Sequence, residues 1–212
     1  MNILMFGPNG SGKGTQGALI KKAFGLAHIE SGAIFREHVG GGTELGKKAK
    51  EYMDHGHLVP DEVIIGIINE RLQAEDCKKG YILDGVPRTI AQAEALDKAG
   101  IVFDAVINLE ISDEEILQRM SGRRVCEKCG ASYHVVAIPP KVEGVCDVCG
   151  GALVQRADDA PKTVASRLEV YHRETEPLKE YYAQKGNLKE IFNQPTVEGT
   201  TQKILEALGQ NV

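Results

Sequence analysis

A glycine-rich stretch close to the N-terminus, GPNGSGKGT at residues 7–15, restricts the fold of this chain more than any other segment. The apolar run Ile3 to Phe6 precedes it and predicts a short buried strand, and residues 16–24 predict a helix. In such a strand–loop–helix unit, backbone N–H groups and the positive end of the helix dipole favour a bound phosphate, and one lysine contacts the outer phosphate groups. Lys13 has the position of that lysine. The segment therefore predicts a nucleotide-phosphate site.

The loop matches the general phosphate-binding pattern with one departure. That pattern is Gly, four residues, and then Gly-Lys followed by Ser or Thr. Gly14 stands at the hydroxyl position, and Thr15 follows one place later. A flexible glycine turn without a ligand is the alternative interpretation. The residues expected to bind phosphate are Gly10, Ser11, Gly12, Lys13, Gly14 and Thr15.

The length of 212 residues predicts one domain, or one core that carries insertions. A hydrophobic content of 42% and a charged content of 26% are ordinary for a globular protein. The net charge of −5 argues against a nucleic-acid partner, which usually needs a basic face. No apolar stretch has the length of a membrane span and the N-terminus lacks a signal-peptide layout, so we expect a cytoplasmic protein.

Strand and helix patterns alternate along most of the chain, which predicts an α/β fold with a five-stranded parallel sheet covered by helices on both faces. The expected strands are residues 3–6, 27–29, 81–84, 104–109 and 188–192. Two segments differ from this core. Residues 30–60 contain three consecutive glycines and a polar helix, and residues 122–160 are rich in Gly, Pro, Cys and Val without helical periodicity. We expect the core to consist of residues 1–29, 61–121 and 161–212.

Several helix boundaries have sequence signals. Asp61 is expected to cap a helix that continues to about Glu75. Thr89 with Gln92, and Ser112 with Glu115, predict capping boxes. One long helix is expected from residue 159 to about 185, with an apolar face formed by Val164, Leu168, Tyr171, Leu178 and Tyr181.

Four of the five cysteines form two Cys-x-x-Cys pairs with sixteen residues between them, and Cys77 is expected to be incidental. In a reducing compartment this pattern favours a metal over disulfides. Four thiolates leave no open coordination position, so the metal is expected to be structural, with Zn²⁺ favoured and Fe²⁺ or Co²⁺ as alternatives. His134 is an alternative ligand, for which we prefer a nucleotide-contacting or packing role. The predicted ligands are Cys126, Cys129, Cys146 and Cys149.

Asp84 ends an apolar strand, and a carboxylate in that position commonly lies near Mg²⁺ in nucleotide-binding proteins. Its alternative role is to cap the following turn. Arg88 follows closely in the segment DGVPRT, and a buried arginine there would need an anion.

Four motifs together resemble those of adenylate kinases, specifically the bacterial type with a long lid and a metal site in it. The motifs are GPNGSGKGTQ at 7–16, DGVPRT at 84–89, RADD at 156–159 with Arg167 and Tyr171 after it, and EGT at 198–200. The resemblance runs from residue 3 to about 205. It implies the nucleoside monophosphate kinase fold, with an AMP-binding insertion at 30–60 and a lid at 122–160 that closes over ATP. It also implies a monomer that interconverts ATP and AMP with ADP, using Mg²⁺ on the nucleotide.

The resemblance assigns roles to individual residues. Those expected to act on the transferring phosphoryl group are Lys13, Arg88, Arg123, Arg156 and Arg167. Besides the loop, ATP is expected to contact Arg119, Arg123, Tyr133, His134 and Thr200, with Arg119 stacked on adenine. AMP is expected to contact Ser31, Gly32, Arg36, Leu58, Val59, Gly85, Arg88, Gln92, Arg156 and Arg167. Asp84 and Thr15 are expected near Mg²⁺. A helix N-cap is the alternative role for Ser31.

Three residues depart from the family pattern: Asn9 stands where many members have Pro, Ala33 where many have Asp, and Val86 where Phe is usual. Ala33 removes a carboxylate from the expected network of Mg²⁺-bound waters, which leaves Asp84 as the main candidate. A kinase specific for UMP, CMP or GMP is the nearest alternative function. Two further alternatives are a regulatory nucleotide switch and a zinc-ribbon protein that binds nucleic acid. The sequence does not contain the Asn-Lys-x-Asp motif of the first, and the residues around its cysteines do not form the basic surface that the second needs.

Overall fold

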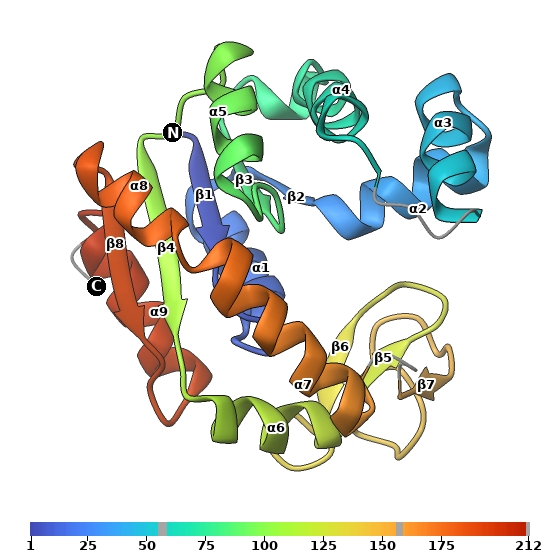
Figure 1. Cartoon of the computed structure of the whole chain (residues 1–212). Helices are drawn as coiled ribbons and strands as arrows, with labels where there is room; N and C mark the ends of the chain where they lie inside the picture. Colours follow the sequence, from blue (N-terminus) through green and yellow to red (C-terminus); the bar gives the residue numbers. More distant parts are fainter. Residues whose placement is uncertain (55–58, 156–158, 211–212) are drawn as a thin grey trace.

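The computed structural model describes residues 1–54, 59–155 and 159–210, apart from the side chains of Arg36 and of residues 52–54 (Figure 1). A parallel five-stranded sheet forms the centre, in the order β2-β3-β1-β4-β8. Its strands are β1 (Ile3–Phe6), β2 (Ala27–Glu30), β3 (Tyr81–Asp84), β4 (Ala105–Glu110) and β8 (Leu188–Phe192). The predicted α/β class and parallel sheet are therefore confirmed. Because the strands are parallel, their carboxyl ends meet at one edge, where ligands bind in folds of this type.

Helices cover both faces of the sheet, which explains why the three central strands β3, β1 and β4 are almost wholly buried. Successive side chains of a strand point to opposite faces. Leu4 and Phe6 of β1 pack in one cluster, with residues of α4 (Asp61–Leu72), α5 (Ile90–Lys98) and α8 (Leu178–Gln184). Ile3 and Met5 pack in the other, with Ile20 of α1 (Lys13–Phe24) and Ile204 of α9 (Val197–Ala207).

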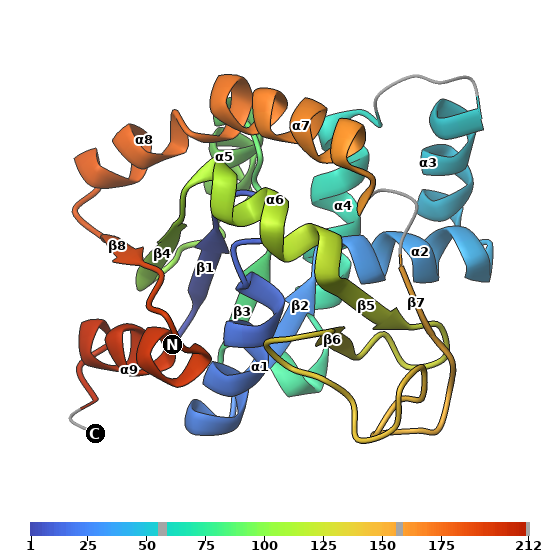
Figure 2. The ribbon, with the colours of Figure 1, turned by 90° about the horizontal axis from the view of Figure 1, so that it is seen from below.

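Two additional segments project from the same side of the sheet in both views (Figures 1 and 2). The first contains α2 (Ser31–Gly41) and α3 (Glu44–Asp54), which pack on each other. The second contains a small antiparallel sheet in the order β6-β5-β7, formed by β5 (Arg123–Cys126), β6 (Ser132–His134) and β7 (Leu153–Val154). Two helices join it to the core, α6 (Asp113–Gly122) and α7 (Pro161–Val170).

The expected long helix after residue 159 is interrupted. A π-helical turn η3 (Tyr171–Thr175) follows α7, and Pro177 separates it from α8. Proline has no N–H to donate to the helix ladder, and a π turn changes which side chains share a face. As a result Tyr182, 1% exposed, enters the core, whereas Tyr181 remains partly exposed and donates its hydroxyl hydrogen bond to Asp97 Oδ2 at 2.5 Å. Tyr181 still packs against the main core, as predicted, but only partly buried, with its hydroxyl at the surface.

The N-cap residues of four helices agree with the predicted caps in two cases and differ from them in the other two. Pro60, not Asp61, precedes the first residue of α4, and Glu30, not Ser31, precedes that of α2, so neither side chain is an N-cap. Thr89 and Ser112 accept hydrogen bonds from the N–H groups of Gln92 and Glu115, which confirms both caps. Cys77, the last residue of the short helix η1 (Glu75–Cys77), is buried in the main core.

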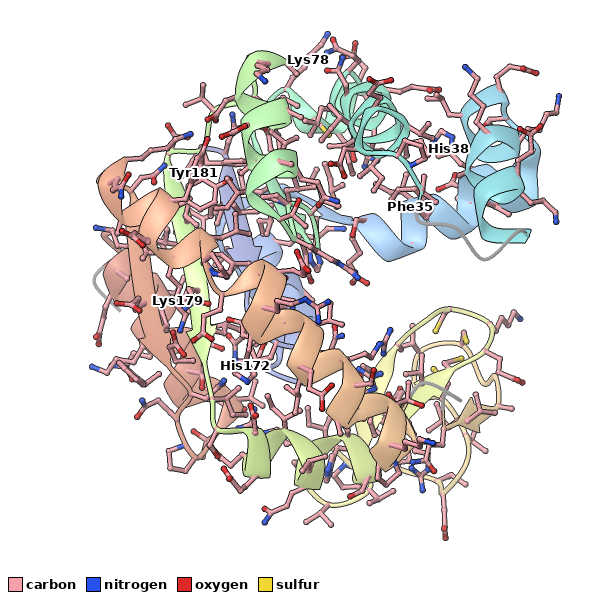
Figure 3. All side chains as sticks on the ribbon, viewed as in Figure 1. Phe35, His38, Lys78, His172, Lys179 and Tyr181 are labelled. Atoms are coloured by element: carbon pink, nitrogen blue, oxygen red, sulfur yellow. The ribbon has the colours of Figure 1, made fainter. Side chains whose placement is uncertain are left out.

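A cluster of charged side chains at the N-terminus of α6 leads to a prediction about how the stability of the protein depends on pH. His172 of η3 lies 3.1 Å from Asp113 Oδ2 and 2.8 Å from Glu176 Oε2 (Figure 3). The hydrogen bond to Glu176, and then that to Asp113, raise the pKa of His172. Because the pKa of His172 is higher in the folded than in the unfolded protein, these contacts stabilise the fold fully below about pH 6.5, the ordinary pKa of histidine. The stabilisation is lost as pH rises through the folded-state pKa of His172.

The side chains of His172 and Asp113 are each 44% exposed, so solvent screening limits the effect to about 0.5 kcal/mol. We therefore expect the wild type to melt at a higher temperature than His172→Gln at pH 6, and we expect this difference to be smaller at pH 9. Thermal unfolding followed by circular dichroism measures it. A difference that stays constant over this range would contradict the assignment.

Candidate active site and metal centre

The glycine-rich loop lies between β1 and α1, as predicted. Gly7 and Gly10 have φ angles of 141° and 91°, a region that L side chains rarely adopt. A Cβ atom on Gly7 would lie 2.8 Å from the Leu109 carbonyl oxygen, and one on Gly10 would lie 2.8 Å from Met120 Sδ. Helix α1 begins at Lys13, and no side chain caps its N-terminus. The first N–H groups of this helix are therefore positioned for an anion.

Lys13 lies inside this loop. Its Nζ donates hydrogen bonds to the carbonyl oxygens of Gly7 (2.8 Å) and Pro8 (2.9 Å). Burial lowers the pKa of Lys13, the negative charge of Asp84 opposes that shift, and the positive charges of Arg88 and Arg123 add to it. Cations gathered around a half-buried lysine favour an anionic ligand of high charge, such as a polyphosphate.

The predicted catalytic arginines gather around the same point. Although Arg88 keeps a solvent-exposed face, partial desolvation and the positive charge of Arg167 lower the pKa of its guanidinium. Arg88 Nε donates to the Gly85 carbonyl oxygen at 2.8 Å. The charges of Lys13, Arg88, Arg123 and Arg167 thus influence one another. Arg156 lies outside the described residues.

Arg123 forms a two-pronged ion pair that the sequence did not reveal. Its Nε donates to Asp159 Oδ2 at 2.9 Å and its Nη2 donates to Oδ1 of the same carboxylate, whose side chain is fully buried. The pair connects the start of β5 with the start of α7, 36 residues apart. It fixes the direction of the guanidinium at the point where the small sheet joins the core.

The residues expected around AMP lie at the ends of β2 and β3. Ser31 is 2% exposed, and a Cβ atom on Gly85 would lie 2.6 Å from its Oγ, so only glycine fits there. Gln92 fulfils a dual structural role, because its Oε1 accepts from Arg88 N at 2.7 Å and its Nε2 donates to Asp61 Oδ1 at 2.9 Å. Gly32 is the second residue of α2.

Other residues in this region are less completely defined. Val59 is half-buried, and Val86 is buried in the main core. Leu58 and the side chain of Arg36 lie outside the described part of the structure.

The residues expected to contact ATP outside the phosphate loop include Arg119, Thr200 and His134, which lie on three separate elements. Arg119 remains partly exposed on α6, 3.8 Å from Glu115 Oε1. The Thr200 hydroxyl accepts from Gln194 N and donates to the Thr196 carbonyl, and His134 Nδ1 accepts from the N–H groups of Val136 and Ala137. The Thr200 hydroxyl and His134 Nδ1 are therefore already bonded within the protein, and for His134 this supports the packing alternative of the two preferred roles.

The four predicted cysteines come together. Their Sγ atoms lie within 4.8 Å of one another, at 3.5 Å for Cys126–Cys149 and 3.6 Å for Cys129–Cys146. A tetrahedron with zinc–sulfur bonds of about 2.3 Å has edges of about 3.8 Å, so the site fits a tetrahedral metal. The two Cys-x-x-Cys segments form turns of the same kind. In the first, Gly130 N donates a hydrogen bond to the Cys126 carbonyl oxygen, and in the second, Gly150 N donates one to that of Cys146. His134 does not belong to the ligand group found among the described residues.

Tyr133 belongs to this metal centre rather than to a nucleotide surface. It is 7% exposed, its hydroxyl lies 3.5 Å from Cys146 Sγ, and it accepts a hydrogen bond from Asp147 N at 2.8 Å. The hydroxyl group lowers the pKa of Cys146 to about 6, which favours the thiolate that metals bind. In place of the expected ATP contact, we therefore assign Tyr133 a role in supporting the cysteine ligand Cys146.

Asp84 fits a site near Mg²⁺. It is 8% exposed at the carboxyl end of β3, and its charge acts on Lys13. Thr15 lies in the first turn of α1, partly exposed. Carboxylate and hydroxyl oxygens are ligands that Mg²⁺ prefers, often through bound water.

Comparisons with known proteins agree with this geometry. The sequence profile of the adenylate kinase family matches residues 5–187. The adenylate kinase of Caldicellulosiruptor bescii is 56% identical over 213 residues, covering 99% of each chain. That of Carboxydothermus hydrogenoformans is 55% identical over 98% of this chain and 99% of its own, and that of Clostridioides difficile is 50% identical over 99% of each. In the described residues, no helix is long and apolar enough to span a membrane. Because the family profile matches most of the chain and relatives at least half identical to it cover nearly all of it, the protein belongs to the adenylate kinase family.

Proposed function

We propose that the protein transfers the terminal phosphoryl group of ATP directly to AMP, giving two molecules of ADP, and that the reaction is reversible. The observation that carries this proposal is the group of cations around Lys13, formed by residues from four separate parts of the chain. A site for one nucleotide would not need so many. Two phosphate chains that meet end to end carry enough negative charge to require them.

In this proposal ATP binds with its phosphates at the N-terminus of α1. Lys13 then exchanges the carbonyl oxygens of Gly7 and Pro8 for phosphate oxygens. AMP binds where β2 and β3 end, beside Ser31, Gly85 and Gln92. Arg88 and Arg36 hold its phosphate, and Arg123, Arg156 and Arg167 surround the transferring group.

Phosphoryl transfer requires little covalent help from the protein. The AMP phosphate is already an anion, so no general base is needed, and catalysis comes from positioning and from neutralised charge. Arginine suits this task because its planar guanidinium binds phosphate through paired hydrogen bonds. Mg²⁺ bound to the nucleotide, near Asp84 and Thr15, supplies further charge neutralisation.

We further propose that residues 30–60 and 122–160 are mobile segments around a core of residues 1–29, 61–121 and 161–212. Closure of both segments would exclude water, which otherwise competes with AMP as acceptor. The projection of α2–α3 and of the β5–β7 sheet from one side of the core supports this division. The four cysteines would hold Zn²⁺ as a structural ion, without a free position for substrate.

Substrate choice tests the proposal. A coupled assay with ATP as donor should show strong preference for AMP over UMP, CMP and GMP. The same assay without any monophosphate measures hydrolysis of ATP by water, which should be slow. A strong preference for another monophosphate would overturn the proposal in favour of the related kinases.

A further inference from the structure

Three polar side chains share one face at the carboxyl ends of β2 and β3. Glu30 and Asp84 are partners in register on these adjacent parallel strands, and His28 lies two residues before Glu30. Side chains two apart in a strand point to the same side. The His28 ring lies between the two carboxylates, with Nδ1 3.9 Å from Glu30 Oε1 and Nε2 3.9 Å from Asp84 Oδ2.

This face is turned toward the phosphate loop. A Cβ atom on Gly17 of α1 would lie 2.3 Å from His28 Nε2, so the ring packs directly against that helix. A Cβ atom on Gly14 would lie 3.7 Å from Glu30 Oε1, which places the carboxylate of Glu30 beside the first turn of α1. The charge of Asp84 also acts on Lys13, the first residue of this helix. Both carboxylates therefore lie near the start of α1.

His28 is an independent indication of a ligand at this point. Its side chain is 7% exposed, and no described group forms a hydrogen bond with its buried Nε2. The distance of 3.9 Å to Asp84 is too long for a direct hydrogen bond. A buried polar atom without a partner costs about 1–3 kcal/mol. A water molecule in the shell of a hydrated cation between the carboxylates would offer this nitrogen a partner.

We propose that Glu30 positions the hydrated Mg²⁺ of bound ATP, in place of the Asp that many family members have where this chain has Ala33. The inference rests on the proposed function. Mg²⁺ retains several waters in nucleotide sites, so a carboxylate can act on it without direct coordination. Glu30 ends β2 with an extended backbone immediately before α2, and Ala33 is the third residue of that helix. The Glu30 side chain, 51% exposed, is one methylene longer than Asp, and its Oε1 lies beside Gly14 in the first turn of α1.

Glu30 is a positioning residue, because it touches neither phosphate nor the reacting atoms. Its test therefore measures cation binding rather than turnover. Mn²⁺ serves as the probe, titrated into the full chain in the presence of a non-hydrolysable ATP analogue and followed by electron paramagnetic resonance. We expect Glu30→Gln to weaken Mn²⁺ binding about 10-fold, as is typical of a lost outer-shell partner. Affinity for the metal-free analogue should not fall, since a negative charge near the phosphates has been removed.

Two further variants complete the experiment. Glu37→Gln removes an exposed carboxylate from α2, the helix that follows Glu30, and should bind Mn²⁺ like the wild type. The double variant Glu30→Gln with Ala33→Asp should regain most of the lost affinity. Wild-type Mn²⁺ affinity in Glu30→Gln, or no recovery in the double variant, would overturn the inference while leaving the proposed function intact. A wild-type protein that bound no ATP analogue at all would instead overturn the proposed function.

Discussion

Replacing Arg88 by alanine is expected to lower turnover by about 10³-fold or more while the protein remains folded. The guanidinium lies in the group of cations around Lys13, near Arg167, and its Nε bonds only to the carbonyl oxygen of Gly85 among the contacts described here. Its removal therefore takes away charge at the transferring phosphoryl group without leaving a buried carboxylate unpaired. Steady-state rates in the coupled assay, with thermal unfolding of the same sample, measure both parts of the expectation.

Arg124→Ala provides a matched control for this experiment. Arg124 is the neighbour of Arg123 in β5, and its Nη1 donates to the carbonyl oxygens of Ser121 and Arg123. We expect its turnover to remain within about threefold of the wild type, because loss of such a contact affects stability rather than the phosphate site. Near-normal rates for Arg88→Ala would contradict the role assigned to this arginine.

Arg123→Ala should lose turnover to a similar extent and, in addition, stability. The carboxylate of Asp159 is fully buried and would be left without its guanidinium partner. Breaking a buried ion pair from one side costs about 3 kcal/mol or more. This variant is therefore a poorer test of catalysis than Arg88→Ala, although the sequence alone makes the two look equivalent.

Removal of the metal is expected to unfold the small sheet while the core persists. The buried side chains of this segment form a small cluster around Cys126, Tyr133 and Cys146. Such a cluster cannot offset the conformational entropy of nearly forty residues, whereas a structural zinc contributes roughly 10 kcal/mol or more. Hydrogen exchange should show loss of protection in β5 and β6 after chelation, and retained protection in β1 and β4.

Single cysteine variants separate the metal effect from general damage. Cys126→Ser should lose the metal and behave like the chelated protein. Cys77→Ala, which alters the one cysteine outside the cluster, should retain one metal ion per chain by elemental analysis, and the same analysis identifies that ion. One cooperative unfolding transition of the whole chain, unchanged by a chelator, would argue against an independent metal-dependent segment.

Local patterns in the sequence were sufficient for the strands, the phosphate loop and the metal ligands of this protein, but not for the break in the long helix after residue 159. The glycine-rich loop, the five strands and the two Cys-x-x-Cys turns each depend on residues within about ten positions of one another. The positive φ of Gly7 and Gly10 is a local backbone requirement of the tight turn. For this reason the parallel sheet, the phosphate loop and the metal ligands could be predicted without coordinates.

Contacts between distant residues were decided only by the tertiary structure. The pair of Arg123 and Asp159 spans 36 residues, and the bond between Gln92 and Asp61 spans 31. The alignment of Glu30 with Asp84 depends on β2 lying beside β3 in one particular register. A strand pattern specifies which side chains alternate but not which strand becomes the neighbour. The sequence thus determined the chemistry available to this protein, and the packing of the sheet decided which charges face one another.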